Sequence, residues 1–237
     1  LDTAKRYLKS ILENMQPVIE AGVPVVGLEP SCVAVFRDEM LGLFPENQDA
    51  IRLQDKTFLL SEFLMKHADG WSPPHIGGKA LVHIHCHHKS VLGKEAELEL
   101  LKKMGIEAEQ PEPGCCGLAG SFGFEAGKYG VSQAIGEQRL LPAVRKADGE
   151  KLLIADGFSC ETQIEQGSGR KPMHIAEVIA SALPKDTASL APRKTHRLLK
   201  VGAAGAAGIG ALVASRLLLR ALRPRPSGVR HEVQTAR

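Results

Sequence analysis

The amino-acid sequence predicts an α/β fold with a mainly parallel sheet and flanking helices. Short apolar runs alternate along the chain with longer helical patterns, and Gly and Pro residues mark many of the boundaries. This alternation is typical of parallel strands joined by crossover helices. With 237 residues, 43% of them hydrophobic, the chain is long enough to bury a sizeable core.

The elements are expected in the following order. Apolar residues recur at helical spacing from residue 4 to residue 18, and Gly22 and Pro24 end that pattern. The apolar run VPVVGL at 23–28 is of the buried-strand type. By the same criteria, further strands are expected at 80–85, 106–109 and 152–155, and further helices at 58–67, 94–104, 132–144 and 174–183.

Residues 1–185 are expected to form the main domain, and the composition changes after it. The segment 186–200 is polar and predicts a linker, 201–223 is rich in Gly and Ala and predicts an apolar helix, and 224–237 predicts a disordered tail. The apolar helix has too short an uninterrupted run for the roughly twenty residues of a membrane span. Its basic flanks suit an anionic membrane surface. Membrane contact and a low-complexity helix without it both stay open.

Composition excludes a nucleic-acid-binding surface and indicates a reducing compartment. The net charge is only +3, and the aromatic residues (Phe 7, Tyr 2, Trp 1) are too few for stacking platforms. The five cysteines form an odd set without a secretory leader, which argues against a disulfide framework. We therefore expect a cytoplasmic protein, either free or peripheral to the inner face of the membrane. Because the chain enters a helical pattern directly at Leu1, a cut inside a longer polypeptide is also expected.

Three cysteines follow predicted strands. Cys32 comes after the first strand, Cys86 ends the second and Cys160 follows the fourth. In parallel α/β sheets, ligands gather outside the carboxyl ends of the strands. We therefore expect these thiols to converge at one edge of the sheet.

The adjacent pair Cys115 and Cys116 lies in the sequence PEPGCCGLAGSFG. Gly114 and Gly117 permit a sharp bend, so both thiolates can face one polynuclear cluster, with backbone amides free to bond cluster sulfurs. The arrangement C86-x28-C115-C116-x43-C160 lacks the short spacing of ferredoxins and the C-x2-C pairs of structural zinc sites. The alternatives are a set of inert buried thiols and a metal-free thiol–disulfide relay.

Four histidines flank Cys86, at positions 83, 85, 87 and 88. In an alternating strand His83 and His85 share one face, and His87 would continue it. His85 and His87 are candidates for hydrogen bonds to a cluster or for titration alongside electron transfer. Direct metal ligation by one of these rings is the alternative.

The remaining charged residues indicate ordinary structural roles. We expect Arg37 to be paired within the chain, on a helix face after Cys32. Asp156 precedes Gly157 at a strand end, where a turn carboxylate and a functional carboxylate both stay open. The sequence contains no convincing Ser/His/Asp constellation, so no catalytic side chain is predicted. It also has no Rossmann G-x-G-x-x-G after a strand, so no flavin or nucleotide site is visible.

Four segments together resemble the CCG, or cysteine-rich, domain: GLEPSCVAVFRDE, HIHCHHK, GCCGLAGSFGFE and ADGFSCETQI. That domain occurs in heterodisulfide reductase, in iron–sulfur subunits of glycerol-3-phosphate and glycolate oxidases, and at the C-terminus of flavin-linked 2-hydroxyacid dehydrogenases. The resemblance is strongest to the last group and covers roughly residues 1–183. The family pattern ends in C-x2-C, but here Gly157 and Gln163 stand at the positions three away from Cys160.

The family's cysteine pattern usually occurs in two copies. The resemblance implies an iron–sulfur cluster held by Cys86, Cys115, Cys116 and Cys160, which match the second copy, with Cys32 as the last ligand of an incomplete first copy. Because the final C-x2-C is incomplete, a four-thiolate 4Fe–4S cluster and a five-thiolate noncubane cluster both stay open. The implied function is electron transfer within a flavin-linked oxidoreductase that oxidises lactate, glycolate or 2-hydroxyglutarate. FAD would bind to a missing N-terminal part, a ferredoxin-like domain would pass electrons on, and a quinone-like molecule would accept them. The rivals are a cluster- or thiol-based disulfide reductase and a zinc-bound structural module.

Overall fold

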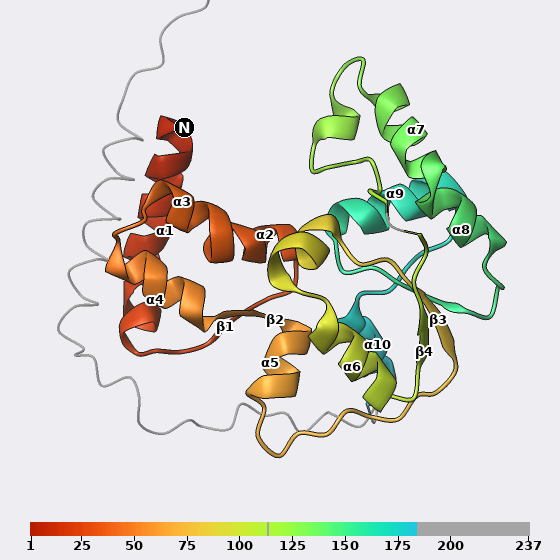
Figure 1. The fold of residues 1–237 in the computed structure, drawn as a ribbon, viewed down its shortest axis with the longest axis horizontal. Coiled ribbons are helices and arrows are strands. Elements are labelled where there is room, and N and C mark those ends of the chain that lie inside the picture. The colour runs from red at the N-terminus through yellow and green to blue at the C-terminus, as the bar shows by residue number, and fades with distance from the viewer. Residues whose placement is uncertain (113, 184–237) are drawn as a thin grey trace, which may run out of the picture. The chain divides into compact units, whose positions relative to one another are not determined.

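The computed structural model describes residues 1–112 and 114–183 (Figure 1). The chain divides into one compact unit, Leu1–Pro184, and a second unit, Lys185–Arg237. The predicted linker at 186–200, apolar helix at 201–223 and tail at 224–237 all lie outside the described residues. Among the helices that are described, none combines the length and the apolar character that a membrane span requires.

The strands form two small sheets, and every pair in them is parallel. Strands β1 (Val25–Gly27) and β2 (Thr57–Leu59) make a two-stranded sheet. Strands β3 (Lys79–Val82), β4 (Glu107–Glu109) and β5 (Leu152–Ile154) make a three-stranded sheet in the order β4-β3-β5. The α/β class with parallel strands is confirmed. The expectation of one shared edge is wrong, because β1 belongs to a different sheet from β3 and β5.

Helices connect the strands and cover both sheets (Figure 1). Most are short, and two five-residue π-helices, η1 and η2, follow the segments that carry Cys32 and Cys86. The helical elements are α1 (Asp2–Glu20), α2 (Pro30–Ala34), η1 (Val35–Glu39), α3 (Met40–Leu43), α4 (Gln48–Lys56), α5 (Leu60–Lys66), η2 (His88–Leu92), α6 (Glu95–Lys103), η3 (Phe122–Phe124), α7 (Tyr129–Gln138), α8 (Leu140–Lys146), α9 (Phe158–Ser168) and α10 (Ile175–Ser181).

The three-stranded sheet is packed on both faces, as its alternating side chains require. On one face, Val82 and Ile154 join a buried cluster with residues of α6 and α10, including Leu100. On the other face, Leu81 and Leu153 pack against α8, α9 and the segment that carries the adjacent cysteines. The sheet therefore holds the cysteine segment against a rigid core.

The N-terminal part has its own core. Leu8 and Leu12 of α1 pack with Met40 of α3 and Leu53 of α4. Arg37 of η1 donates to both carboxylate oxygens of Glu62 in α5, at 3.1 and 2.8 Å. The pairing expected for Arg37 is thus confirmed, and its partner also accepts from the backbone N–H of Leu59.

Most predicted elements are present, and two differ for identifiable reasons. The helix expected at 58–67 begins only at Leu60, because Thr57–Leu59 instead pairs with β1 as a strand. The helix expected at 132–144 breaks at Arg139 into α7 and α8. Pro142 explains the break, since its ring lacks an N–H and would clash with the carbonyl of Gln138 in a continuous helix.

Candidate metal centre

Three segments meet beyond the carboxyl ends of β3 and β5, which are neighbours in the sheet. Strand β3 ends at Val82, earlier than expected, and Cys86 follows in the turn before η2. Cys160 lies in the first turn of α9, a helix that the sequence patterns did not reveal. The glycine-framed loop adds Cys115 and Cys116.

The four thiols contact one another in a chain. The side chain of Cys86 is hydrogen-bonded to that of Cys115, Cys115 to Cys116, and Cys116 to Cys160. Cys116 and Cys160 are only 3% and 2% exposed, whereas Cys115 is half-buried and Cys86 is exposed. The structure therefore brings together the four cysteines that the sequence singled out, with one side of the set reaching solvent.

The contacts lower the pKa of two of the four thiols and raise the pKa of the other two. Hydrogen bonds from Cys116 and Cys86 hold the pKa of Cys115 far below its usual value. A hydrogen bond from Cys116, helped by His83, lowers the pKa of Cys160 to about 5 despite burial. Hydrogen bonding to these two thiolates raises the pKa of Cys86 and Cys116. The contacts thus favour the thiolate form at Cys115 and Cys160, and a bound cation would favour it at all four sulfurs.

The predicted glycines lie at the tightest points of this site. Gly117 has φ +93°, and its N–H donates to Cys115 Sγ at 3.3 Å. A Cβ on Gly117 would lie 2.1 Å from the backbone oxygen of Ser132, so only glycine fits. Gly114 packs against Arg139, where a Cβ would meet the arginine Cβ at 3.2 Å. Gly157 allows His85 and Cys160 to approach the backbone closely.

The histidines around Cys86 do not share a strand face, because β3 ends before them. His83 and His85 are buried, and His83 lies beside Cys160, whose pKa it helps to lower. His85 Nδ1 accepts the N–H of His87 at 3.2 Å, and the two ring centroids lie 5.3 Å apart. His83 and His85 both lie close enough to Cys160 to lower its pKa, and the backbone N–H of His87 donates to Cys86.

Cys32 lies apart from the other thiols. It is exposed in α2, and its pKa is raised by partial burial and by Glu29, not by another cysteine. Its segment is nevertheless tied to the site, because Glu29 accepts the N–H of Phe158 and the carbonyl of Leu28 lies 2.8 Å from His174 Nε2. The structure places Cys32 near the site's border without joining it to the four contacting thiols.

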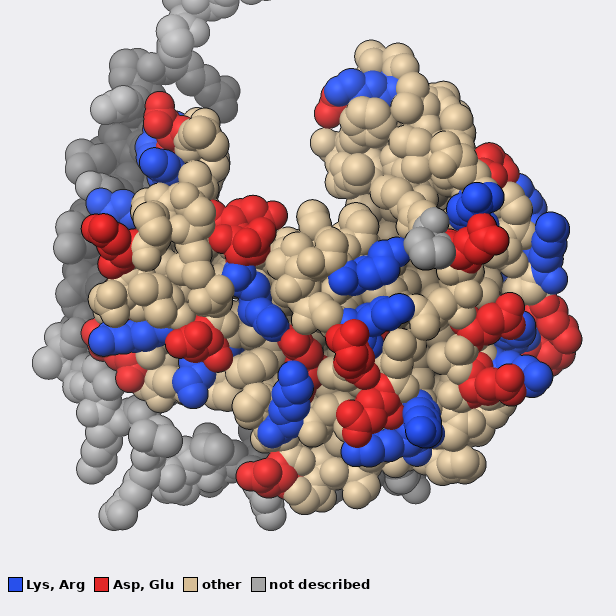
Figure 2. Space-filling view, viewed as in Figure 1, with Lys and Arg blue, Asp and Glu red and all other residues tan. Residues whose placement is uncertain are grey.

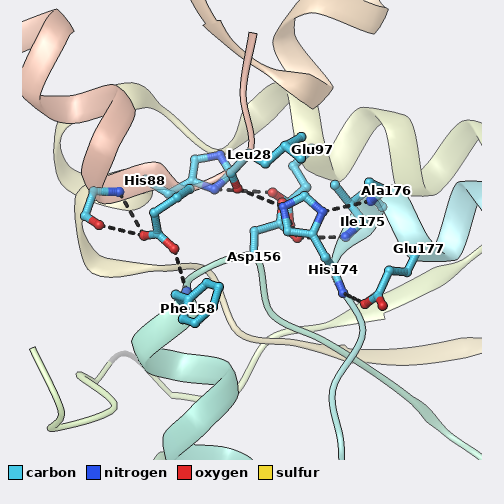
Figure 3. Close-up of polar contacts among 11 residues, drawn as sticks. Leu28, His88, Glu97, Asp156, Phe158, His174, Ile175, Ala176 and Glu177 are labelled. Atoms are coloured by element: carbon cyan, nitrogen blue, oxygen red, sulfur yellow. Dashed lines mark hydrogen bonds and ion pairs between the residues drawn. The ribbon is translucent and has the colours of Figure 1, made fainter. Parts of the chain in front are cut away.

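A buried acid pair lies next to the cysteine segments (Figure 3). Glu97 of α6 is 2% exposed and shares a hydrogen bond with the largely buried carboxyl group of Asp156. Burial and this contact raise the pKa of Glu97, so Glu97 holds the shared proton. His88 Nδ1 lies 3.2 Å from Glu97 Oε2, and since both groups are neutral the contact is not an ion pair. The sequence patterns did not single out Glu97, whose segment EAELELLKK is typical of a charged surface helix.

Acidification is expected to destabilise the metal-free protein through His88. Burial lowers the pKa of this ring from 6.5 to about 4. Between these values the unfolded ring binds a proton and the folded ring does not, so stability present above pH 6.5 is lost as the pH falls towards 4. Urea unfolding at pH 7 and pH 4 should show the wild type losing about 3 kcal/mol more than His88→Gln. The exposed His67→Gln is the control, and parallel profiles for His88→Gln and wild type would contradict the assignment.

The described residues contain no group of three or more His, Cys, Asp or Glu side chains in the geometry of a formed metal site. The thiol contacts run pairwise from Cys86 to Cys160. Their chemistry nevertheless fits a thiophilic metal group, because soft sulfur donors, two of them with a lowered pKa, lie side by side. The backbone N–H of Gly117, directed at sulfur, fits the same interpretation.

The sequence is similar to proteins named as dehydrogenases or dehydrogenase subunits and to lactate utilization proteins. No protein-family model matches the sequence. The chain is 31% identical over 187 residues to a subunit of the anaerobic glycerol-3-phosphate dehydrogenase of Escherichia coli (strain K12), covering 74% of this chain and 45% of that protein. It is 29% identical over 178 residues to D-2-hydroxyglutarate dehydrogenase of Pseudomonas putida, covering 73% of this chain and 17% of that protein. It is 31% identical over 196 residues to lactate utilization protein A of Geobacillus sp. (strain WCH70), covering 74% of this chain and 79% of that protein.

The parallel α/β fold, the four contacting thiols and these relatives define a class, that of cysteine-rich proteins related to oxidoreductases. The chain spans less than half the length of the first two relatives but most of the third. It belongs to the lactate utilization protein A family.

Proposed function

We propose that this chain is the iron–sulfur electron-transfer part of an oxidoreductase that acts on a 2-hydroxy acid. The observation that carries the proposal is the contact among the thiols of Cys86, Cys115, Cys116 and Cys160. Four soft donors at one site suit iron–sulfur chemistry better than oxygen-ligated metals. When bound, such a cluster accepts and releases single electrons.

The surrounding residues have the properties that such a cluster requires. Cys116 and Cys160 are buried in an apolar cluster with Leu118 and Leu153, which would exclude water from one side. The hydrogen bond from Gly117 N–H to sulfur and the His83 ring beside Cys160 would tune the reduction potential. The exposed side, at Cys86, would let electrons enter and leave.

The names of the relatives support the substrate class. Lactate and 2-hydroxyglutarate are both 2-hydroxy acids, whereas glycerol 3-phosphate is an alcohol of another kind. We assign substrate oxidation to an FAD-containing part outside this chain, with a ferredoxin-like domain as electron donor and a quinone-like acceptor. The described residues contribute no catalytic side chain to this scheme.

The surface near the site suits contact with such a partner domain. Phe124, Tyr129 and Val131 are more than half exposed although large and apolar. In Figure 2 the part of the molecule formed by η3 and α7 is mostly uncharged, while Lys, Arg, Asp and Glu gather over the region of α5 and α6. Exposed apolar patches of this kind mark protein–protein contacts.

The rival functions are a disulfide reductase and a zinc-bound structural module. The lowered pKa of Cys160 would favour thiol chemistry, but its thiol is buried and inaccessible to a substrate disulfide. A zinc module would use the same four sulfurs at one tetrahedral ion.

Metal and sulfide analysis separates these functions. The full chain is expressed with iron and sulfide present, or reconstituted anaerobically, and the bound iron, sulfide and zinc are measured. The expected result is roughly four iron and four sulfide ions per chain with a brown colour that dithionite bleaches. Zinc without sulfide would support the structural module, and a colourless chain without metal would overturn the proposal.

A further inference from the structure

The buried pair of Glu97 and Asp156 makes contacts with all three segments around the site (Figure 3). Two carboxyl groups in hydrogen-bond contact must retain a proton, so a neutral Glu97 donates to the Asp156 carboxylate. Burying such a pair costs free energy, and a protein with an apolar residue at the same core position is often no less stable. A leucine could fill the same space, but its packing is not directional. Hydrogen bonds are directional, so they fix the relative positions of the segments that they join.

The first contact leads to the segment that carries Cys86. His88, at the start of η2, is 1% exposed and lies against Glu97 Oε2 through its Nδ1 atom. Because Cys86 lies two residues before this ring, the position of Glu97 sets the position of the turn that follows β3.

The second and third contacts start from Asp156, just before α9. Its Oδ1 atom accepts the N–H of Ile175 at 2.8 Å and lies 3.7 Å from His174 Nε2. The backbone of Asp156 itself leads through Gly157 to Cys160. His174 then reaches the carbonyl of Leu28, at 2.8 Å, in the segment that leads to Cys32.

We propose that Glu97 and Asp156 are positioning residues, whose shared hydrogen bond holds the turns bearing Cys86 and Cys160 in register and, through His174, the segment bearing Cys32. The inference rests on the proposed function for its purpose, because the registered turns are those that would hold the cluster. Whether the hydrogen bond holds these segments in place can be tested on the metal-free chain.

The test compares two substitutions of similar size at position 97. In Glu97→Gln the amide can still donate to Asp156, whereas Glu97→Leu keeps the packing and removes both the hydrogen bond to Asp156 and the polar contact with His88. Alkylation of the buried Cys160 and backbone hydrogen exchange at 86–88 and 156–160 are followed by mass spectrometry. We expect Glu97→Leu to raise both rates about tenfold or more through local opening and Glu97→Gln to stay within about twofold of wild type. The matched control is Glu99→Leu on the exposed side of the same helix, where Glu99 pairs with Lys103.

Equal rates for Glu97→Leu and wild type would overturn the proposal, as would equal acceleration by both substitutions at position 97. If Glu97→Leu does not fold, His174→Ala supplies an independent test. It is expected to raise exchange at 28–32 while leaving 86–88 unchanged, and no change at 28–32 would contradict the third contact.

Iron binding distinguishes failure of this inference from failure of the proposed function. A wild-type chain that binds no iron refutes the proposed function, while the exchange and alkylation rates still decide the positioning role. If the wild type binds a cluster, Glu97→Leu is expected to weaken iron affinity about tenfold and Glu97→Gln to restore it, as for partners that orient metal ligands.

Discussion

Replacing Cys116 with serine is expected to abolish the binding of iron. Cys116 contacts both Cys115 and Cys160, so it occupies the middle of the thiol chain. A serine hydroxyl is a harder donor that does not ionise at neutral pH, and its loss as a ligand should reduce bound iron by about tenfold or more. Iron and sulfide per chain after anaerobic reconstitution, together with the visible spectrum, measure the effect.

Two companion variants make this result specific. Cys86 is exposed, so Cys86→Ser should lose iron while keeping the fold intact, which separates ligand loss from unfolding. Cys32→Ser is the matched control, because this exposed thiol lies outside the four contacting ones. The expected outcome is near wild-type iron in Cys32→Ser. Wild-type iron in Cys116→Ser and Cys86→Ser would refute the assignment of the ligands.

Replacing Gly117 with alanine is expected to cause the largest loss of stability of any single methyl addition in the cysteine loop. The backbone has φ +93°, and the new Cβ would lie 2.1 Å from the carbonyl oxygen of Ser132 in α7. Because the obstacle is backbone and not a flexible side chain, the loop or α7 must shift. We expect a loss of about 3 kcal/mol or more in the free energy of unfolding.

Gly120→Ala is the control for this effect. Gly120 lies in the same loop at φ +66°, but a Cβ there meets nothing within 4 Å. Only the cost of the left-handed backbone applies, which is about 1–2 kcal/mol. Denaturant unfolding of the two metal-free variants measures the difference. A Gly117→Ala variant as stable as Gly120→Ala would show that the close approach of loop and helix is not required.

These two results address different properties of the same loop. The serine variants test whether the sulfurs bind metal, and the alanine variants test whether the loop must bend as it does to present them. A loop that is rigid without metal would lower the cost of assembling the cluster, because the ligands would already be in place.

Much of the site follows from local sequence. The glycines around Cys115 and Cys116 indicate a bend, and the strands ending near Cys86 and before Cys160 indicate a common edge. The structure agrees, because β3 and β5 are neighbours. Cys32 illustrates the limit of that reasoning. Its strand β1 is of the same type, yet it pairs with β2, most of which the sequence pattern assigns to a helix.

The sequence by itself determined the alternation of strands and helices and singled out the four cysteines that contact one another, since both depend on spacing and on local backbone preferences. Only the tertiary structure decided which strands share a sheet, that His83 and His85 lie beside Cys160, and that Glu97 is buried against Asp156. The physical reason is that strand pairing and the burial of polar groups are set by partners distant in the chain. A glutamate in a helical pattern looks the same whether it faces water or another carboxyl group.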